Sequence, residues 1–246
     1  MASKSVSEFK KLMEGMECID LSPILMNDMP RWPSHPPLVI NQTVTHGHDG
    51  YYCQTLFMPE HIGSHVDAPA HIHSNLMDRT IESFPAGYLL APAVTYPLYT
   101  LGVVAGREVT VEEITILERK MGDVAGEGDI VLLNYGWEGH ARSDIEWKDF
   151  AYNAPGLDEA AVKLFMERKV RAVGSDTMTC DQAVERAVSH KSYGHDVYWL
   201  PNNILIMEGL VNLGRLPVRS FFIALPLKIK RGSGSPIRCV ALVPKE

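Results

Sequence analysis

The stretch HIGSHVDAPAHIH, residues 61–73, holds four of the ten histidines of the chain. A glycine and a proline within it favour an extended or looped backbone, in which His65 and Asp67 project to the same side at a period of two. A bend at Gly63 would bring His61 towards the same point. Imidazole nitrogens and a carboxylate oxygen are suitable ligands for zinc, manganese or iron. The stretch therefore indicates a metal site, and the alternative is a polar surface loop in which histidines happen to cluster.

Length and composition are those of an ordinary globular protein. The chain has 246 residues, 46% hydrophobic and 22% charged, which predicts a single domain over residues 1–246. A formal net charge of -7 argues against nucleic acid as a partner and favours a small-molecule substrate. No stretch approaches the roughly 20 apolar residues that span a bilayer, so no membrane partner is expected. The four cysteines form no CxxC pair, and we expect reduced thiols and a cytoplasmic location.

Short apolar runs alternate with helical patterns along the chain. Strands are predicted where such runs stand between turn-forming residues, at 18–22, 91–99, 129–134, 204–207, 221–227 and 237–243. Helices are predicted at 5–16, 110–121 and 157–168, with Asn153 or Pro155 as the start of the last one. A β-hairpin is predicted at 40–58, and GSGSP at 232–236 is expected to be a turn between strands. The alternation predicts a mixed α/β fold.

Residues 61–71 resemble the HxGTHxDxPxH signature of the cyclase-like metal-dependent hydrolases, a family that includes bacterial kynurenine formamidase and isatin hydrolase. Ser64 stands where the signature has threonine. Weaker similarity extends to DLSPILMNDMPRWP, GSDTMTCD, ILIMEGL and ALPLKIKRGSGSPIR, at 20–33, 174–181, 204–210 and 224–238. The resemblance implies a single α/β domain of the swivelling β/α/β type with a mixed sheet. It also implies a homodimer or a larger homo-oligomer.

The same resemblance implies roles for the clustered residues. His61, His65 and Asp67 would bind a catalytic divalent metal, zinc or manganese, as one or two ions. His71 would be the acid/base residue, a role that suits histidine because its ordinary pKa of about 6.5 permits both protonation states.

A second ion would need later residues of the chain. In relatives with two ions a histidine and a glutamate complete the site, and His195 and Glu208 are the residues that the resemblance assigns. The spacing between them is about one residue longer than in kynurenine formamidases, and His190 is a nearby competitor. Relatives of the isatin hydrolase type hold a single ion. The alternative for Glu208 is a buried structural carboxylate with a hydrogen-bond partner.

The function implied by the resemblance is that of an amidohydrolase. It would open the C–N bond of an aryl formamide or an isatin-like lactam, using water activated by the metal. Two alternatives remain: a lactone hydrolase, cyclase or dehydratase that uses the same metal site, and a metal- or ligand-binding homologue without turnover. A serine hydrolase is not supported, because the sequence has no GxSxG nucleophile elbow.

Other residues are candidates for the surroundings of the site. Trp32, Phe57 and Trp199 would suit a pocket for a flat substrate, and core packing is the alternative for each. Asp176 lies at the end of the strand-like run VRAVGSDT, residues 170–177, where we expect it to cap a following helix rather than to reach the pocket.

Overall fold

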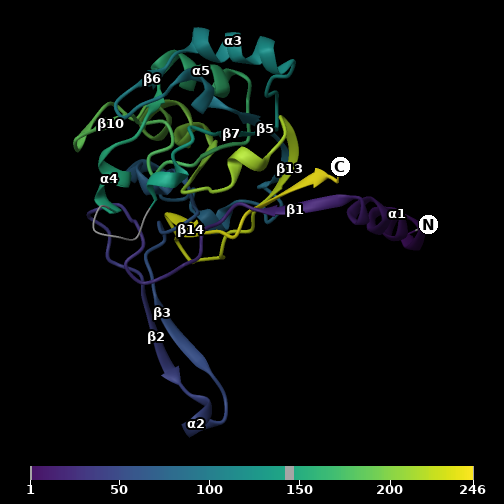
Figure 1. The fold of residues 1–246 in the computed structure, drawn as a ribbon, viewed down its shortest axis with the longest axis vertical. Coiled ribbons are helices and arrows are strands. Elements are labelled where there is room, and N and C mark those ends of the chain that lie inside the picture. The colour runs from purple at the N-terminus through teal and green to yellow at the C-terminus, as the bar shows by residue number, and fades with distance from the viewer. Residues whose placement is uncertain (1, 142–146, 246) are drawn as a thin grey trace.

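The computed structural model describes residues 2–141 and 147–245 (Figure 1). Its main sheet has nine strands in the order β1-β15-β13-β5-β7-β9-β12-β4-β14. Their bounds in that order are Met16–Asp20, Val240–Pro244, Arg219–Ile223, Leu90–Tyr96, Ile130–Leu133, Ala172–Ser175, Leu205–Glu208, His65–Asp67 and Gly234–Pro236. Strands β5, β7, β9 and β12 pair in parallel, and the remaining neighbours pair antiparallel. The α/β fold with a mixed sheet is therefore confirmed.

Shorter strands and the helices surround this sheet. The short strands are Val39–Val44 (β2), Cys53–Phe57 (β3), Glu108–Val109 (β6), Gly156–Leu157 (β8), Val184–Glu185 (β10) and Val188–Ser189 (β11). The α-helices are Ala2–Glu14 (α1), His46–Asp49 (α2), Val111–Met121 (α3), Trp147–Tyr152 (α4) and Glu159–Glu167 (α5). Figure 1 shows α3 and α5 together on one side of the molecule.

The two longer helices on the body begin at clear capping residues. Thr110 caps α3 in a capping box with Glu113. Asp158 caps α5, because its carboxylate accepts a hydrogen bond from the backbone N–H of Ala161. The predicted start of this helix at Asn153 or Pro155 is wrong, because the residues between them and Asp158 continue into β8, which pairs with β6.

The central strands are covered on both faces. Val131 and Leu133 of β7 belong to an apolar cluster that also contains Phe165 of α5, while Ile130 and Leu132 belong to a second cluster. All four side chains of β7 are fully buried, as expected for a parallel strand between two layers. Because β7, β9 and β12 are parallel, their carboxyl ends meet at one edge of the sheet, where α/β proteins commonly place their ligands.

The C-terminal part of the chain differs from the prediction. The GSGSP stretch is not only a turn, because Gly234–Pro236 forms strand β14 and pairs with β4. The strand predicted at 237–243 begins later, as β15 at Val240. Pairing with a strand from the first third of the chain gives these residues a ladder partner that local sequence does not reveal.

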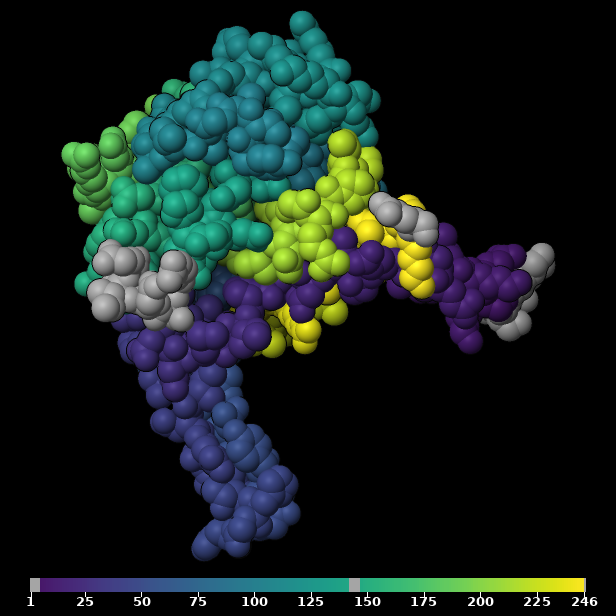
Figure 2. All heavy atoms as spheres, viewed as in Figure 1, coloured from purple at the N-terminus to yellow at the C-terminus, as the bar shows by residue number. Residues whose placement is uncertain are grey.

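Two segments project from the body as arms. The predicted hairpin is present as β2 and β3, with α2 at its tip, and Figures 1 and 2 show it reaching far beyond the rest of the molecule. All five residues of β3 are exposed. Helix α1 projects in another direction and exposes Val6, Phe9 and Leu12. None of the described helices has both the length and the apolar character needed to cross a bilayer.

Candidate metal centre

Strands β4 and β12 bring the side chains of His65, Asp67 and Glu208 together. In their antiparallel register Glu208 lies opposite His65, and Ile206 lies opposite Asp67. Directly opposed residues of an antiparallel pair point to the same face, and so do residues two apart in one strand. His65, Asp67 and Glu208 therefore share one face, and Nε2 of His65 lies 3.4 Å from Oε2 of Glu208.

His61 reaches this face through the bend that precedes β4. Gly63 has a φ of +59°, a left-handed conformation that favours glycine. Nδ1 of His61 lies 2.6 Å from Oδ1 of Asp67. The other ring nitrogen lies 2.9 Å from Oγ of Ser233, whose hydroxyl donates to Glu60. With a metal bound, the Ser233 hydroxyl would accept a hydrogen bond from Nε2–H of His61, and Nδ1, which faces Asp67, would be the metal-binding nitrogen.

His195 comes from the π-helical turn Gly194–Tyr198, labelled η6. Its Nε2 atom lies 3.4 Å from Oδ2 of Asp67 and 3.5 Å from Oε1 of Glu208. A π turn takes one more residue per turn than an α turn. His190 instead lies outside this cluster, where its half-exposed ring contacts Glu108 at 2.9 Å.

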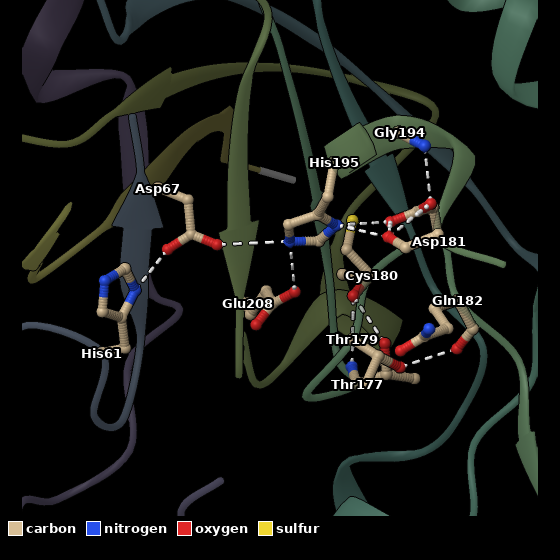
Figure 3. A network of polar contacts seen from close by, with 12 residues as sticks. His61, Asp67, Thr177, Thr179, Cys180, Asp181, Gln182, Gly194, His195 and Glu208 are labelled. Atoms are coloured by element: carbon tan, nitrogen blue, oxygen red, sulfur yellow. Dashed lines mark hydrogen bonds and ion pairs between the residues drawn. The ribbon is translucent and has the colours of Figure 1, made fainter. Parts of the chain in front are cut away.

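The five side chains form two overlapping groups around Asp67. Possible ligand atoms of His61, His65 and Asp67 lie within 4.8 Å of one another, and those of Asp67, His195 and Glu208 do likewise. Figure 3 shows Asp67 with one oxygen directed at His61 and the other at His195. Asp67 is therefore the residue that the two groups share.

The donor set fits divalent ions. Oε1 of Glu208 is buried and has no hydrogen-bond partner among the described residues; its charged neighbour is His195 at 3.5 Å, which leaves a lone pair available to a cation. Three imidazoles and two carboxylates are also the ligand types that zinc and manganese accept. The structure thus supports a metal centre over a surface loop or a merely structural glutamate.

The electrostatics of the protein alone balance histidine cations against carboxylates. Burial disfavours a charge on His65, but contacts with Glu208 and Asp67 raise its pKa to about 9. Burial likewise opposes ionisation of Asp67, yet the neighbouring His61 and His195 hold its pKa well below the usual range. Burial raises the pKa of Glu208. A divalent ion that binds here would displace protons from the histidines and take over the balancing of the carboxylate charges.

His71 lies beside the cluster without belonging to either group of ligands. It ends the 3₁₀ turn Pro69–His71, labelled η1, which begins with the proline of the signature. Its ring stacks on that of His61, with the centroids 4.0 Å apart. Burial, together with the nearby His61 and His195, lowers the pKa of His71 to about 4, although Asp67 opposes this shift. The ring is therefore neutral near pH 7 and can accept a proton.

A cavity of about 680 Å³ opens onto the cluster, and Trp32, His35, His71 and Met178 contribute to its lining. The other two aromatic candidates lie elsewhere. Phe57 is 64% exposed on the hairpin arm and lies outside the described lining of this cavity, because β3 runs away from the body. Trp199 is fully buried in the core. Of the three aromatic candidates, only Trp32 can therefore contact a substrate in the cavity of its own chain.

Two further buried carboxylates lie near the site; the sequence singled out Asp176 as a helix cap and did not single out Asp181. No helix begins directly after Asp176. Its carboxylate accepts hydrogen bonds from the backbone N–H groups of Tyr135 and Trp137 and lines the cavity. Burial raises the pKa of Asp176 to about 6. Asp181 contacts His195 at 2.8 Å. Both lie in the GSDTMTCD segment, whose similarity to the family was the one available signal.

Comparison with known proteins agrees with this geometry. The family model described as "Putative cyclase" matches residues 19–182. The chain belongs to the cyclase family. Among its relatives in this family, an isatin hydrolase of Roseibium aggregatum is 26% identical over 260 residues, covering 96% of this chain and 95% of the relative. A kynurenine formamidase of Bacillus thuringiensis subsp. konkukian is 26% identical over 242 residues, covering 93% and 98% respectively.

Solved structures of the cyclase family show the same fold. Isatin hydrolase A from Labrenzia aggregata, bound to benzyl benzoate, matches with a TM-score of 0.85 and 25% identity, covering 98% of this chain and all of the other. An isatin hydrolase bound to thioisatinate, a product analogue, matches over the full length of both chains with a TM-score of 0.81 and 24% identity. The curated relatives identify the chain as a hydrolase, and its cluster of ligands fits a divalent metal.

Proposed function

We propose that this chain hydrolyses the C–N bond of an aryl formamide or an isatin-like lactam at a centre of two divalent ions. The carrying observation is the convergence of two ligand groups on the shared carboxylate of Asp67. The isatin hydrolase of Roseibium aggregatum and the kynurenine formamidase of Bacillus thuringiensis support an amide or lactam substrate over a lactone or a cyclisation. Zinc and manganese are the ions that best suit the mixed nitrogen and oxygen ligands.

The proposed ligands divide between the two ions. His61 and His65 would hold the first ion, His195 and Glu208 the second, and Asp67 both. Bound ions of this type lower the pKa of a water molecule and polarise a substrate carbonyl. His71, neutral and beside the cluster, would take a proton from the attacking water and return it to the departing nitrogen. Trp32 in the cavity wall would contact the flat ring of the substrate.

Metal analysis coupled to hydrolysis assays tests this proposal. Purified protein would be stripped with a chelator, reloaded with zinc or manganese, and assayed with N-formylkynurenine and isatin. We expect two ions per chain and turnover that returns only with metal. His65→Ala should lose full metal loading and turnover. The matched variant His190→Ala, outside the cluster, should keep full metal loading and turnover. Wild-type protein that binds no metal under any of these conditions would refute the proposal.

We further infer that residues 1–246 act as one domain in a homodimer or a larger homo-oligomer. The hairpin arm exposes Tyr51, Tyr52, Leu56 and Phe57. A lone two-stranded hairpin is at best marginally stable in water, so packing against a second copy would stabilise it. Light scattering of the wild type and of a variant with these four residues changed to serine would test this, and a monomeric wild type would contradict it.

The four cysteines are free in the structure. We infer from this a reducing, cytoplasmic environment. Localisation of the tagged protein by cell fractionation would test this inference, and recovery from an extracytoplasmic fraction would overturn it.

A further inference from the structure

Asp181 is a buried carboxylate that belongs to neither group of metal ligands. It is 1% exposed. One of its oxygens lies 2.8 Å from Nδ1 of His195, and the other accepts a hydrogen bond of 2.7 Å from the backbone N–H of Gly194. The hydroxyl of Ser192 shares its one proton between the two oxygens, at 3.2 and 3.1 Å, and its own oxygen lies 2.8 Å from Nδ1 of His195. Figure 3 shows the contacts with His195 and Gly194 on the side of His195 that faces away from Asp67.

These contacts decide which nitrogen of His195 is free to bind a metal. A carboxylate can only accept a hydrogen bond, so Nδ1 of His195 must carry the proton. The lone pair of the metal-binding form is then on Nε2, the atom that faces Asp67 and Glu208. The additional bond to Gly194 fixes the backbone beside His195, so Asp181 restrains both the ring and the turn that carries it.

The outer contacts of the first ion position are of a different kind. Nδ1 of His65 lies 2.9 Å from the backbone carbonyl oxygen of Gly63. Nε2 of His61 contacts the hydroxyl of Ser233. Among the described residues, His195 is thus the proposed ligand histidine whose ring nitrogen facing away from the metal position contacts a buried carboxylate directly. Removing the Asp181 charge should therefore change the affinity for the second ion and not for the first.

We propose that Asp181 is a positioning residue that holds His195 in its Nε2-binding form and thereby sets the affinity of the second ion, at Asp67, His195 and Glu208. This proposal rests on the proposed two-ion function. Carboxylates that orient metal-binding histidines commonly contribute about 10- to 100-fold to metal affinity, because they fix the ring and increase its basicity. The first ion, held by His61, His65 and Asp67, should bind with unchanged affinity.

The first experiment is a competition titration of metal-free protein with zinc against a chromophoric chelator, which yields both dissociation constants. Asp181→Asn removes the charge with little change of volume. We expect the weaker of its two sites to lose roughly 10- to 100-fold in affinity while the other is unchanged. Asp176→Asn is the matched control, since Asp176 is a buried carboxylate of the same segment whose hydrogen-bond partners in the described part of the chain are backbone N–H groups and not histidines. It should leave both dissociation constants at their wild-type values.

A double-mutant cycle separates positioning from general structural damage. If Asp181 acts through His195, then Asp181→Asn should have no further effect on metal affinity in a His195→Ala background. Loading with manganese adds a spectroscopic readout, because the spin coupling of a manganese pair should disappear from the EPR spectrum at low occupancy of the second site. Thermal unfolding of each variant reports on its fold.

The outcomes distinguish this proposal from the proposed function. Wild-type protein that binds fewer than two ions refutes the two-ion centre, and the role of Asp181 with it. Two ions in the wild type, combined with wild-type affinities in Asp181→Asn, refute the role of Asp181 alone. Equal loss at both sites, or a full effect of Asp181→Asn in the His195→Ala background, also overturns it, because either result shows a structural effect that does not pass through His195.

Discussion

The rings of His61 and His71 stack with their centroids 4.0 Å apart and an angle of 30° between their planes. One ring belongs to a proposed metal ligand and the other is neutral near pH 7, because burial and the neighbouring histidines lower the pKa of His71 to about 4. A neutral imidazole has a free lone pair that can accept a proton from water attacking the substrate. In the proposed mechanism, this contact would join a metal ligand to the proton-transferring residue.

Replacement of His71 should separate these two roles. We expect His71→Gln to reduce kcat by roughly 100- to 10,000-fold, the usual contribution of a general acid/base residue, while the metal content stays at the wild-type value. Steady-state kinetics and metal analysis of the same preparation would check this. Substantial turnover in the variant would show that His71 is a packing residue.

Metal affinity should depend steeply on pH. Because the pKa of His65 is raised to about 9 in the protein without metal, its ring is protonated at pH 7 and must lose that proton when an ion binds. Affinity should therefore rise as the pH is raised from 6 to 9. Calorimetry in two buffers of different ionisation enthalpy would count the released protons, and zinc affinity that is independent of pH would contradict the expectation.

The same shift predicts how the metal-free protein responds to pH. A histidine whose pKa is raised on folding stabilises the folded state below its ordinary pKa of 6.5, and this stabilisation disappears as the pH passes through about 9. We expect the chelated protein to melt at a lower temperature at pH 9 than at pH 6.5. His65→Gln should weaken this dependence on pH, and an equally steep dependence in the variant would assign it to other groups.

The space that Gly234 leaves beside His61 should be essential for stability and for metal binding. A Cβ atom added at Gly234 would lie 2.6 Å from Cε1 of His61 and 2.6 Å from the carbonyl oxygen of Val66. Overpacking of this kind costs about 1–3 kcal/mol, so Gly234→Ala should lower the free energy of unfolding by that amount. It should also lower the affinity for the first ion. Gly87→Ala, where an added Cβ meets nothing within 4 Å, is the control. Denaturant titration and metal analysis would compare the two, and equal behaviour would argue against this close contact.

The cysteines should divide into two pairs by reactivity. Cys180 and Cys239 are buried, and burial raises the pKa of the Cys180 thiol well above its usual value and that of Cys239 to about 11. Cys18 and Cys53 are exposed. A chromogenic thiol reagent should therefore leave Cys180 and Cys239 unmodified in the native protein and modify all four thiols after denaturation. Cys18→Ser should remove one fast equivalent, and rapid modification of all four native thiols would contradict the burial of Cys180 and Cys239.

Local patterns predicted the parts of the site that depend on neighbouring residues. The period of two from His65 to Asp67 is the period of strand β4, and the apolar run before Glu208 is strand β12. Alternating strand and helix patterns gave the mixed α/β class. Capping was harder to predict, as the start of α5 at Asp158 shows, because several residues nearby could begin a helix.

What the sequence by itself determined is the ligand-bearing stretch 61–71 and, through its resemblance to a family, the chemistry expected there. Only the tertiary structure decided that His195 rather than His190 meets Asp67, that Asp181 stands behind His195, and that Phe57 lies outside the cavity of its own chain. The physical reason is that local propensity acts over a few residues. The pairing of β4 with β12 and β14 is instead decided by burial of both faces of the sheet, which depends on the whole chain at once.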